Sequence, residues 1–193
     1  MGERLTAMGK RVVSLREPGG TPLGDEVRRL LLDPASEVSA NAEALLFMAS
    51  RAQLVEREIK PALAAGAVVI LDRFFLSTYA YQVAGRGLPE ADVVAANTIA
   101  IGGLRPDLNV ILGLPADVGM DRATKRGPRD RMEQSNAEFH RRVSGAFEQF
   151  VSAEWLLRHP EVGGVVWIRA DGSVEEVHAR VLGHVRANVP ALQ

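Results

Sequence analysis

Residues 67–82, AVVILDRFFLSTYAYQ, carry the clearest structural signal in the sequence. They begin with five aliphatic residues, three of them β-branched, which predict a strand buried on both faces, as in a parallel sheet. The aliphatic run stops at the oppositely charged pair Asp72-Arg73. Because ligands of open α/β sheets bind outside the carboxyl ends of the strands, we expect the functional site at this pair.

A segment with helical character follows the charged pair. Ser77 and Tyr81 are spaced i,i+4, as are Thr78 and Gln82, so their polar groups would line one helix face just beyond the strand. The alternative is an Asp-Arg ion pair that caps a helix and has no further function.

The rest of the chain alternates short aliphatic runs with longer amphipathic segments, which predicts an α/β fold with a parallel sheet. We expect strands at 11–15, 67–71, 108–114 and 165–169, and helices at 24–32, 42–65, 90–101, 116–126, 135–158 and 174–187. Pro61 is expected to kink or interrupt the second of these helices.

Length and composition describe an ordinary globular chain. Its 193 residues favour a single domain over 1–193, with 47% hydrophobic residues and a net charge of -1. The balanced charge argues against a dedicated nucleic-acid binder. The absence of cysteine excludes disulfides, thiolate zinc sites and cysteine nucleophiles. We expect a cytoplasmic protein without a membrane partner, since no secretory signal opens the chain and no apolar run is long enough to span a bilayer.

The loop after the first predicted strand reads REPGGT, residues 16–21. Pro18 fixes its own φ and restricts Glu17, while the two glycines permit backbone conformations closed to other residues. The simplest interpretation is a turn before a helix. However, a charged pair again follows a strand, so we expect one cleft to be surrounded by Arg16, Glu17, Asp72 and Arg73.

Phe47 and Arg51 are spaced i,i+4 on the next predicted helix and project from one face. An aromatic ring that can stack on a base, beside an arginine that can reach a phosphate or a base edge, suits a nucleotide. The alternative is a core phenylalanine and a solvent-exposed arginine.

Basic residues crowd around a Gly-Pro break in RATKRGPRDRME, residues 122–133. Charge runs are usually solvated faces. A hinge with arginines on both sides also suits a mobile lid that closes over polyphosphate, where phosphoryl transfer needs positive charge and the exclusion of water.

These stretches, in this order and spacing, resemble the thymidylate kinase family, which phosphorylates dTMP with ATP. The matching segments span about residues 12–147 and read REPGGTPLGDEVRRLLLD, EALLFMASRAQLVEREIKPAL, VVILDRFFLSTYAYQVAGRGL, LRPDL and RGPRDRMEQ. The resemblance implies a P-loop nucleoside monophosphate kinase fold, with a parallel sheet that has helices on both faces. It also implies in-line transfer of the ATP γ-phosphoryl group to dTMP, ATP and Mg²⁺ as cofactors, and a homodimer.

The resemblance implies a role for each matching residue. Pro18, with its peptide bond in cis, approaches the nucleotide phosphate and sugar together with Glu17. Phe47 stacks on thymine and Arg51 binds the base edge. Arg73 holds the dTMP phosphate, and the pocket is further lined by Ser77, Tyr81 and Gln82, with Tyr81 placed where a ribose 2′-hydroxyl would clash.

The implied catalytic residues are Asp72, Arg126 and Arg131. Asp72 would help to position magnesium, directly or through water. Arg126 and Arg131 belong to the predicted lid, about 122–134, and would stabilise the transferring phosphoryl group. Arg126 would also contact ATP, together with Arg122.

One departure from the family is large. The 193 residues contain no G-x-x-x-x-G-K-[ST] motif, and residues 1–9 resemble the tail of the helix that should follow it. We therefore expect the first, central strand of the fold to be absent from this chain, and we expect Met1 to be a downstream or misassigned start. The alternative is a catalytically dead dTMP-binding protein or a truncated product. A second departure is Gly113, where the family often carries an acidic residue.

Overall fold

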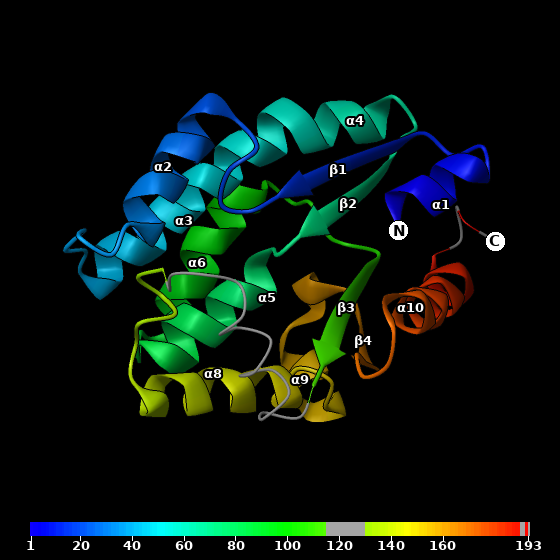
Figure 1. Ribbon diagram of the computed structural model, residues 1–193. Helices are drawn as coiled ribbons and strands as arrows, with labels where there is room; N and C mark the ends of the chain where they lie inside the picture. The colour runs from blue at the N-terminus through cyan, green and yellow to red at the C-terminus, as the bar shows by residue number, and fades with distance from the viewer. Residues whose placement is uncertain (115–129, 190–191, 193) are drawn as a thin grey trace. The chain divides into compact units, whose positions relative to one another are not determined.

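The aliphatic stretch that ends at Asp72 forms strand β2, Val68–Asp72, in a computed structural model that describes residues 1–114, 130–189 and 192. It pairs in parallel with β1, Val12–Arg16, in a register that runs from Val12 opposite Val68 to Arg16 opposite Asp72 (Figure 1). The prediction that both charged pairs lie at one edge of a parallel sheet is therefore confirmed.

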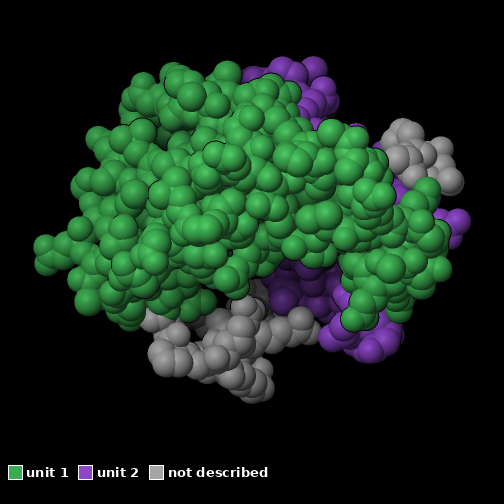
Figure 2. Space-filling model, turned by 90° about the horizontal axis from the view of Figure 1, so that it is seen from above, with its two compact units in different colours: residues 1–104, 129–146 green, residues 105–128, 147–193 purple. Residues whose placement is uncertain are grey.

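The chain divides into two compact units (Figure 2). Unit 1 holds residues 1–104 and 129–146, and unit 2 holds residues 105–128 and 147–193. Besides β1 and β2, unit 1 contains most of α8, Ala137–Gln149, and these elements: α1 Gly2–Ala7, α2 Pro22–Leu32, α3 Ala40–Leu54, η1 Val55–Ile59, α4 Lys60–Ala64, α5 Phe75–Thr78, η2 Tyr79–Gly85 and α6 Glu90–Ile101.

Side-chain caps set where α2 and α3 begin. Thr21 Oγ1 accepts a hydrogen bond from Gly24 N at 3.0 Å, and Pro22 occupies the first helical position, so α2 starts two residues before the predicted Gly24. Ser39 caps α3 in the same way, and α3 begins at Ala40. Both caps are local signals that could have been recognised in the sequence.

The predicted helix 42–65 is not one regular α-helix. It becomes π-helical in η1 and returns to α-helix in α4. Pro61 lacks an amide hydrogen, so the regular bond to the carbonyl of Arg57 cannot form. The predicted interruption near Pro61 is confirmed.

Unit 2 contains a second two-stranded parallel sheet. Strand β3, Leu108–Gly113, pairs with β4, Gly164–Arg169, and α10, Val174–Asn188, packs against both strands. The unit also holds α9, Ala153–Arg158, and the short helix η3, Pro160–Val162. The predicted helix 135–158 is broken because Ser152 starts a new helix, its Oγ accepting from Trp155 N at 3.2 Å.

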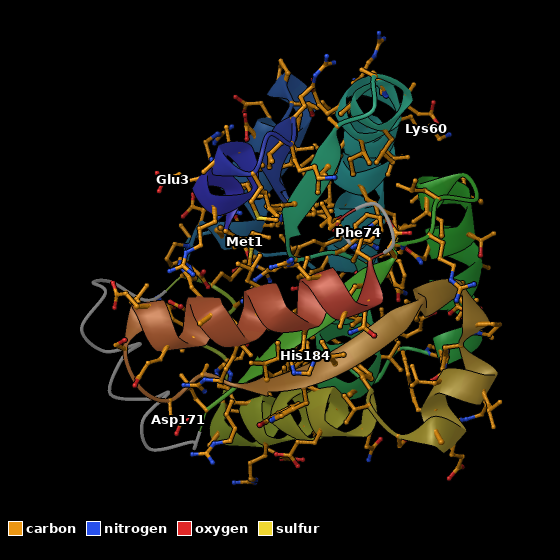
Figure 3. The ribbon with its side chains drawn as sticks, turned by 90° about the vertical axis from the view of Figure 1, so that its right-hand side faces the viewer. Met1, Glu3, Lys60, Phe74, Asp171 and His184 are labelled. Carbon is orange, nitrogen blue, oxygen red and sulfur yellow. The ribbon has the colours of Figure 1, made fainter. Side chains whose placement is uncertain are left out.

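A charged cluster closes the turn between β4 and α10. Asp171, labelled in Figure 3, pairs with Arg169 and with Arg180. The hydrogen bond from Arg169 lowers the pKa of Asp171 to about 2, with a smaller contribution from Arg180. This cluster is exposed, and we assign it a structural role.

Gly113 is explained by close packing. A Cβ atom at this position would lie 2.1 Å from Cζ2 of Trp167, so an acidic side chain of the kind common in the family has no room here. We expect Gly113→Ala to lower the free energy of unfolding by about 1–3 kcal/mol, because the indole must move.

Thermal and urea unfolding would measure this effect. Gly183→Ala in α10 is the matched control, since a Cβ there meets nothing within 4 Å and alanine favours helix by about 0.5–1 kcal/mol. Equal stability changes in the two variants would contradict the packing explanation.

Candidate active site

The loop that follows β1 is tied to its surroundings by its backbone. Glu17 N donates to the Asp72 carbonyl at 2.9 Å, and Gly19 N donates to Ser50 Oγ at 3.2 Å. The Glu17-Pro18 peptide bond is cis, as predicted. Gly20 has φ +80°, and a Cβ there would lie 2.8 Å from a Leu54 methyl group, so both its conformation and its space require glycine.

Three arginines gather where β1 and β2 end. Arg28 Nη1 donates to the Pro18 carbonyl at 2.9 Å. Partial burial lowers the pKa of Arg28, and the nearby charges of Arg16 and Arg73 add to this effect, whereas Asp130 and Asp72 oppose it. A basic cluster beside this loop attracts anions such as phosphate. Arg28 was missed by sequence reasoning, which treated α2 only as a helix.

Arg73 has an unusual backbone conformation for a residue other than glycine. Its φ is +66°, in the left-handed region. Its Nη1 lies 3.4 Å from Ser77 Oγ, and its guanidinium lies 5.5 Å from the centre of the Tyr81 ring. The prediction that Ser77 and Tyr81 share one face just beyond the charged pair is confirmed.

Arg51 is not a solvent-exposed arginine, because only 1% of its surface is exposed. Its Nε lies 2.6 Å from Glu17 Oε1, and it donates to Asn97 Oδ1 at 2.7 Å and to Thr78 Oγ1 at 2.9 Å. Its guanidinium therefore joins the loop after β1 to α6 and to the segment after β2. Asn97 had no distinguishing signal in the sequence, since it lies 46 residues from Arg51.

Glu17 provides the negative charge that compensates the buried positive charge of Arg51. Its side chain is turned inward and buried, and neither of its carboxylate oxygens has a hydrogen-bond partner among the residues that the structure describes, so its contact with Arg51 Nε is an ion pair. Burial raises the pKa of Glu17, while the nearby cation of Arg51 lowers it. The net shift is upward, because burial outweighs the single cation.

Phe47 lies on the same helix as Arg51 and is half-buried. The cluster of buried residues around Met48, Val93 and Ala100 forms without it. The ring is thus neither fully in the core nor fully exposed.

Gln82 is buried and donates its amide Nε2 to Glu43 Oε1 at 2.8 Å. Arg131 reaches the same carboxylate, with Nη2 at 2.6 Å from Glu43 Oε2. Sequence reasoning missed Glu43. The available signal was its spacing, because it precedes Phe47 by four residues and Arg51 by eight on one face of α3.

Two predicted residues, Arg122 and Arg126, lie outside the described residues, as does the predicted helix 116–126. Asp72 is exposed at the end of β2. Within residues 1–114 and 130–189, no cluster of three or more histidine, aspartate or glutamate side chains could hold a metal ion by itself. A single carboxylate still fits Mg²⁺, which is commonly held by one or two carboxylates together with substrate phosphates and water.

In the described part of the chain, no helix is both long and apolar enough to cross a membrane.

Parallel strands with a basic cluster at their carboxyl ends are consistent with an α/β nucleotide kinase fold. A family model described as thymidylate kinase matches residues 1–181. The chain belongs to the thymidylate kinase family, and it is accordingly a phosphotransferase by membership.

Individual relatives agree with this assignment. A thymidylate kinase of Pseudomonas fluorescens is 51% identical over 148 residues, 76% of this chain and 70% of the relative. One from Synechococcus sp. is 46% identical over 190 residues, 97% of this chain and 86% of the relative. The crystal structure of thymidylate kinase from Ehrlichia chaffeensis matches with a TM-score of 0.71 at 28% identity, covering 96% of this chain and 87% of that one.

Proposed function

We propose that this chain transfers the γ-phosphoryl group of ATP to dTMP and forms dTDP. The observation that supports this most directly is the cluster of Arg16, Arg28 and Arg73 beside the cis Glu17-Pro18 loop. Three guanidiniums at the carboxyl end of a parallel sheet suit a doubly charged phosphate.

The nucleoside would occupy the adjoining region. Phe47 would stack on the base, and Arg51 would read its edge from the buried network with Thr78 and Asn97. Glu17 and Pro18 would approach the sugar and phosphate, and Tyr81 would exclude a ribose 2′-hydroxyl. Ser77 and Gln82 would complete the pocket.

The phosphoryl transfer itself needs positive charge and exclusion of water. Arg73 would orient the acceptor phosphate. Arg126 would stabilise the transferring group, and Arg122 would contact ATP. Asp72 would help to hold Mg²⁺, which would supply positive charge to the phosphates. Catalysis would thus rest on positioning and electrostatics, without a covalent intermediate on the protein.

We also propose a homodimer. Large apolar side chains are exposed on helices that pack side by side in unit 1, among them Leu45 on α3 at 62% and Ile99 on α6 at 83%. A second copy of the chain is a partner that could cover such side chains. Light scattering at several concentrations would determine the mass in solution. The predicted cytoplasmic location stays a prediction.

Two measurements on the 193-residue chain test the proposed activity. Isothermal titration calorimetry with dTMP, and with the ribonucleotide as a control, measures binding and discrimination at the 2′ position. Coupled ADP release measures turnover. Saturable dTMP binding with dTMP-dependent ADP formation is expected, whereas binding without ADP would favour the catalytically dead dTMP-binding protein. Absence of dTMP binding in a cooperatively folded sample would refute the assignment.

A further inference from the structure

Glu43 is the most completely buried carboxylate in the described part of unit 1, with 0% of its surface exposed. It lies in the first turn of α3, on the same face as Phe47 and Arg51. The helix that carries the predicted base-binding residues is therefore held at its beginning by this side chain.

Both oxygens of Glu43 are used. Oε1 accepts from Gln82 Nε2 at 2.8 Å and from Arg86 Nε at 3.1 Å. Oε2 accepts from Arg86 Nη2 at 3.0 Å and from Arg131 Nη2 at 2.6 Å. Four charge-assisted or amide hydrogen bonds fill the acceptor capacity of one carboxylate, so no site is left for a ligand.

The charge of Glu43 is required by these partners. Burial acts to raise its pKa, but the hydrogen bonds from Arg86, Gln82 and Arg131 outweigh burial, and the pKa is lowered. A neutral amide at this position would turn an NH₂ group toward a guanidinium or toward the Gln82 amide. Glutamine therefore keeps the shape of the side chain but loses at least one of its four contacts.

Arg131 is engaged on two further sides. Its Nε donates to the Leu31 carbonyl at 2.8 Å, and its backbone N donates to the Leu32 carbonyl at 3.1 Å. These carbonyls end α2, where no further helical turn satisfies them. The guanidinium thus bridges the end of α2 and Glu43, and it is largely buried.

These contacts favour a different role for Arg131 from the phosphoryl-stabilising one that the family resemblance implies. An arginine that acts on a transferring phosphoryl group must present its donors to that group. Here the donors Nε and Nη2 are directed at a carbonyl and a carboxylate of the protein itself.

We infer that Glu43 is a positioning residue for the nucleotide pocket, and that Arg131 acts through Glu43 rather than on the phosphoryl group. Glu43 fixes the amide of Gln82 and joins α3 to η2 and to the end of α2. The inference deepens the proposed function, since it takes Phe47, Arg51 and Gln82 as pocket residues.

The first experiment measures dTMP affinity by calorimetry in Glu43→Gln and in a matched control, Glu26→Gln. Glu26 pairs with Arg29, three residues along the chain, on the exposed surface of α2. We expect Glu43→Gln to weaken dTMP binding by roughly tenfold to a hundredfold, because misplacement of pocket groups by about an ångström has effects of this size. The control should bind as the wild type does. Unchanged affinity in a folded Glu43→Gln variant would overturn the inference.

Arg131→Lys provides a second test that does not depend on Glu43→Gln folding well. Lysine keeps the charge but replaces the two fixed donors Nε and Nη2 with one ammonium group on a flexible stem, so it holds the Leu31 carbonyl and Glu43 in a less defined geometry. A positioning role predicts weaker dTMP binding, and an effect that is not additive with Glu43→Gln. Reduced kcat with unchanged dTMP affinity, additive with Glu43→Gln, would assign Arg131 to the phosphoryl group and overturn the inference.

Failure of the proposed function is recognised separately. It would appear as absence of dTMP binding by the wild-type chain. A double-mutant cycle on unfolding, with the variants Glu43→Gln and Arg131→Lys, would then still measure whether the two side chains are coupled. A coupling free energy of zero would mean that the contact between Glu43 and Arg131 does not contribute to stability, and would overturn the inference.

Discussion

Arg51→Met lowers the free energy of unfolding by about 3–5 kcal/mol at pH 7, because it leaves the Glu17 carboxylate buried without its cation. Methionine retains much of the aliphatic length of the arginine, so loss of packing is a minor part of the effect. Asn97 Oδ1 and Thr78 Oγ1 also lose their donor. The large magnitude follows from burial, since a pair of the same chemistry on the surface contributes about 0–1 kcal/mol.

Urea unfolding measures the difference, with Arg29→Met as the control. Arg29 also pairs with a glutamate, but its side chain is 67% exposed and that of its partner Glu26 69% exposed. The control should lie within about 0.5 kcal/mol of the wild type. Similar losses in both variants would mean that the Glu17-Arg51 pair does not behave as a buried one.

The same variant has a defined pH dependence. The pKa of Glu17 is raised in the folded chain above its ordinary value of 4.5, and removal of Arg51 raises it further. Because the folded-state pKa of Glu17 is raised, the folded chain tolerates the protonated side chain better than the ionised one. The stability associated with protonated Glu17 is fully present below pH 4.5 and is lost as the pH rises through the folded-state pKa. The deficit of Arg51→Met should therefore shrink as the pH falls from 7 toward 4.5.

Arg73→Ala should weaken dTMP binding by about a hundredfold or more, with a strongly raised KM. The guanidinium lies with those of Arg16 and Arg28 at the end of the sheet. Truncation of one partner of a buried, hydrogen-bonded charge pair, such as Arg73 would form with a bound phosphate, typically has an effect of about 2–5 kcal/mol. Calorimetry with dTMP measures the loss directly, without requiring turnover.

Two companion variants separate the side chain from the backbone. Arg73→Gly removes the same guanidinium but accepts the left-handed φ of +66° without strain, so it should bind dTMP as weakly as Arg73→Ala while being the more stable of the two. Arg11→Ala is the control for charge alone, because Arg11 bonds the Ala65 carbonyl before β1 begins. An unchanged KM in Arg73→Ala would refute the assigned role.

The sequence predicted the strands well for a physical reason. A run of aliphatic residues such as 67–71 has few alternatives to a buried strand, and β2 lies within one residue of the expected bounds. The helix 90–101 was predicted with its observed bounds, because polar residues begin it and glycines follow it. The errors lie where a side-chain cap starts a helix, as at Thr21 before α2 and at Ser152 before α9.

The site was predictable only in part. The spacing of Arg73, Ser77 and Tyr81 is local, so a helical period was enough to place them on one face. The partners of Arg51 and Gln82 are distant in the chain, and nothing in a local pattern identifies Asn97 or Glu43 as the groups they meet. The alternative of a solvent-exposed arginine failed at Arg51 because one carboxylate, Glu17, comes into contact with it through folding.

The hydrogen bonds of the loop after β1 should slow the exchange of its amide hydrogens with solvent. It has no regular secondary structure, yet Glu17 N donates to the Asp72 carbonyl and Gly19 N to Ser50 Oγ, while Pro18 between them has no amide hydrogen. Deuterium should therefore enter these amides about as slowly as it enters the neighbouring strand β2. In peptide-resolved measurements, the exchange rates of this irregular segment would match those of the cooperatively folded core. The loop would therefore be rigid before the substrate binds.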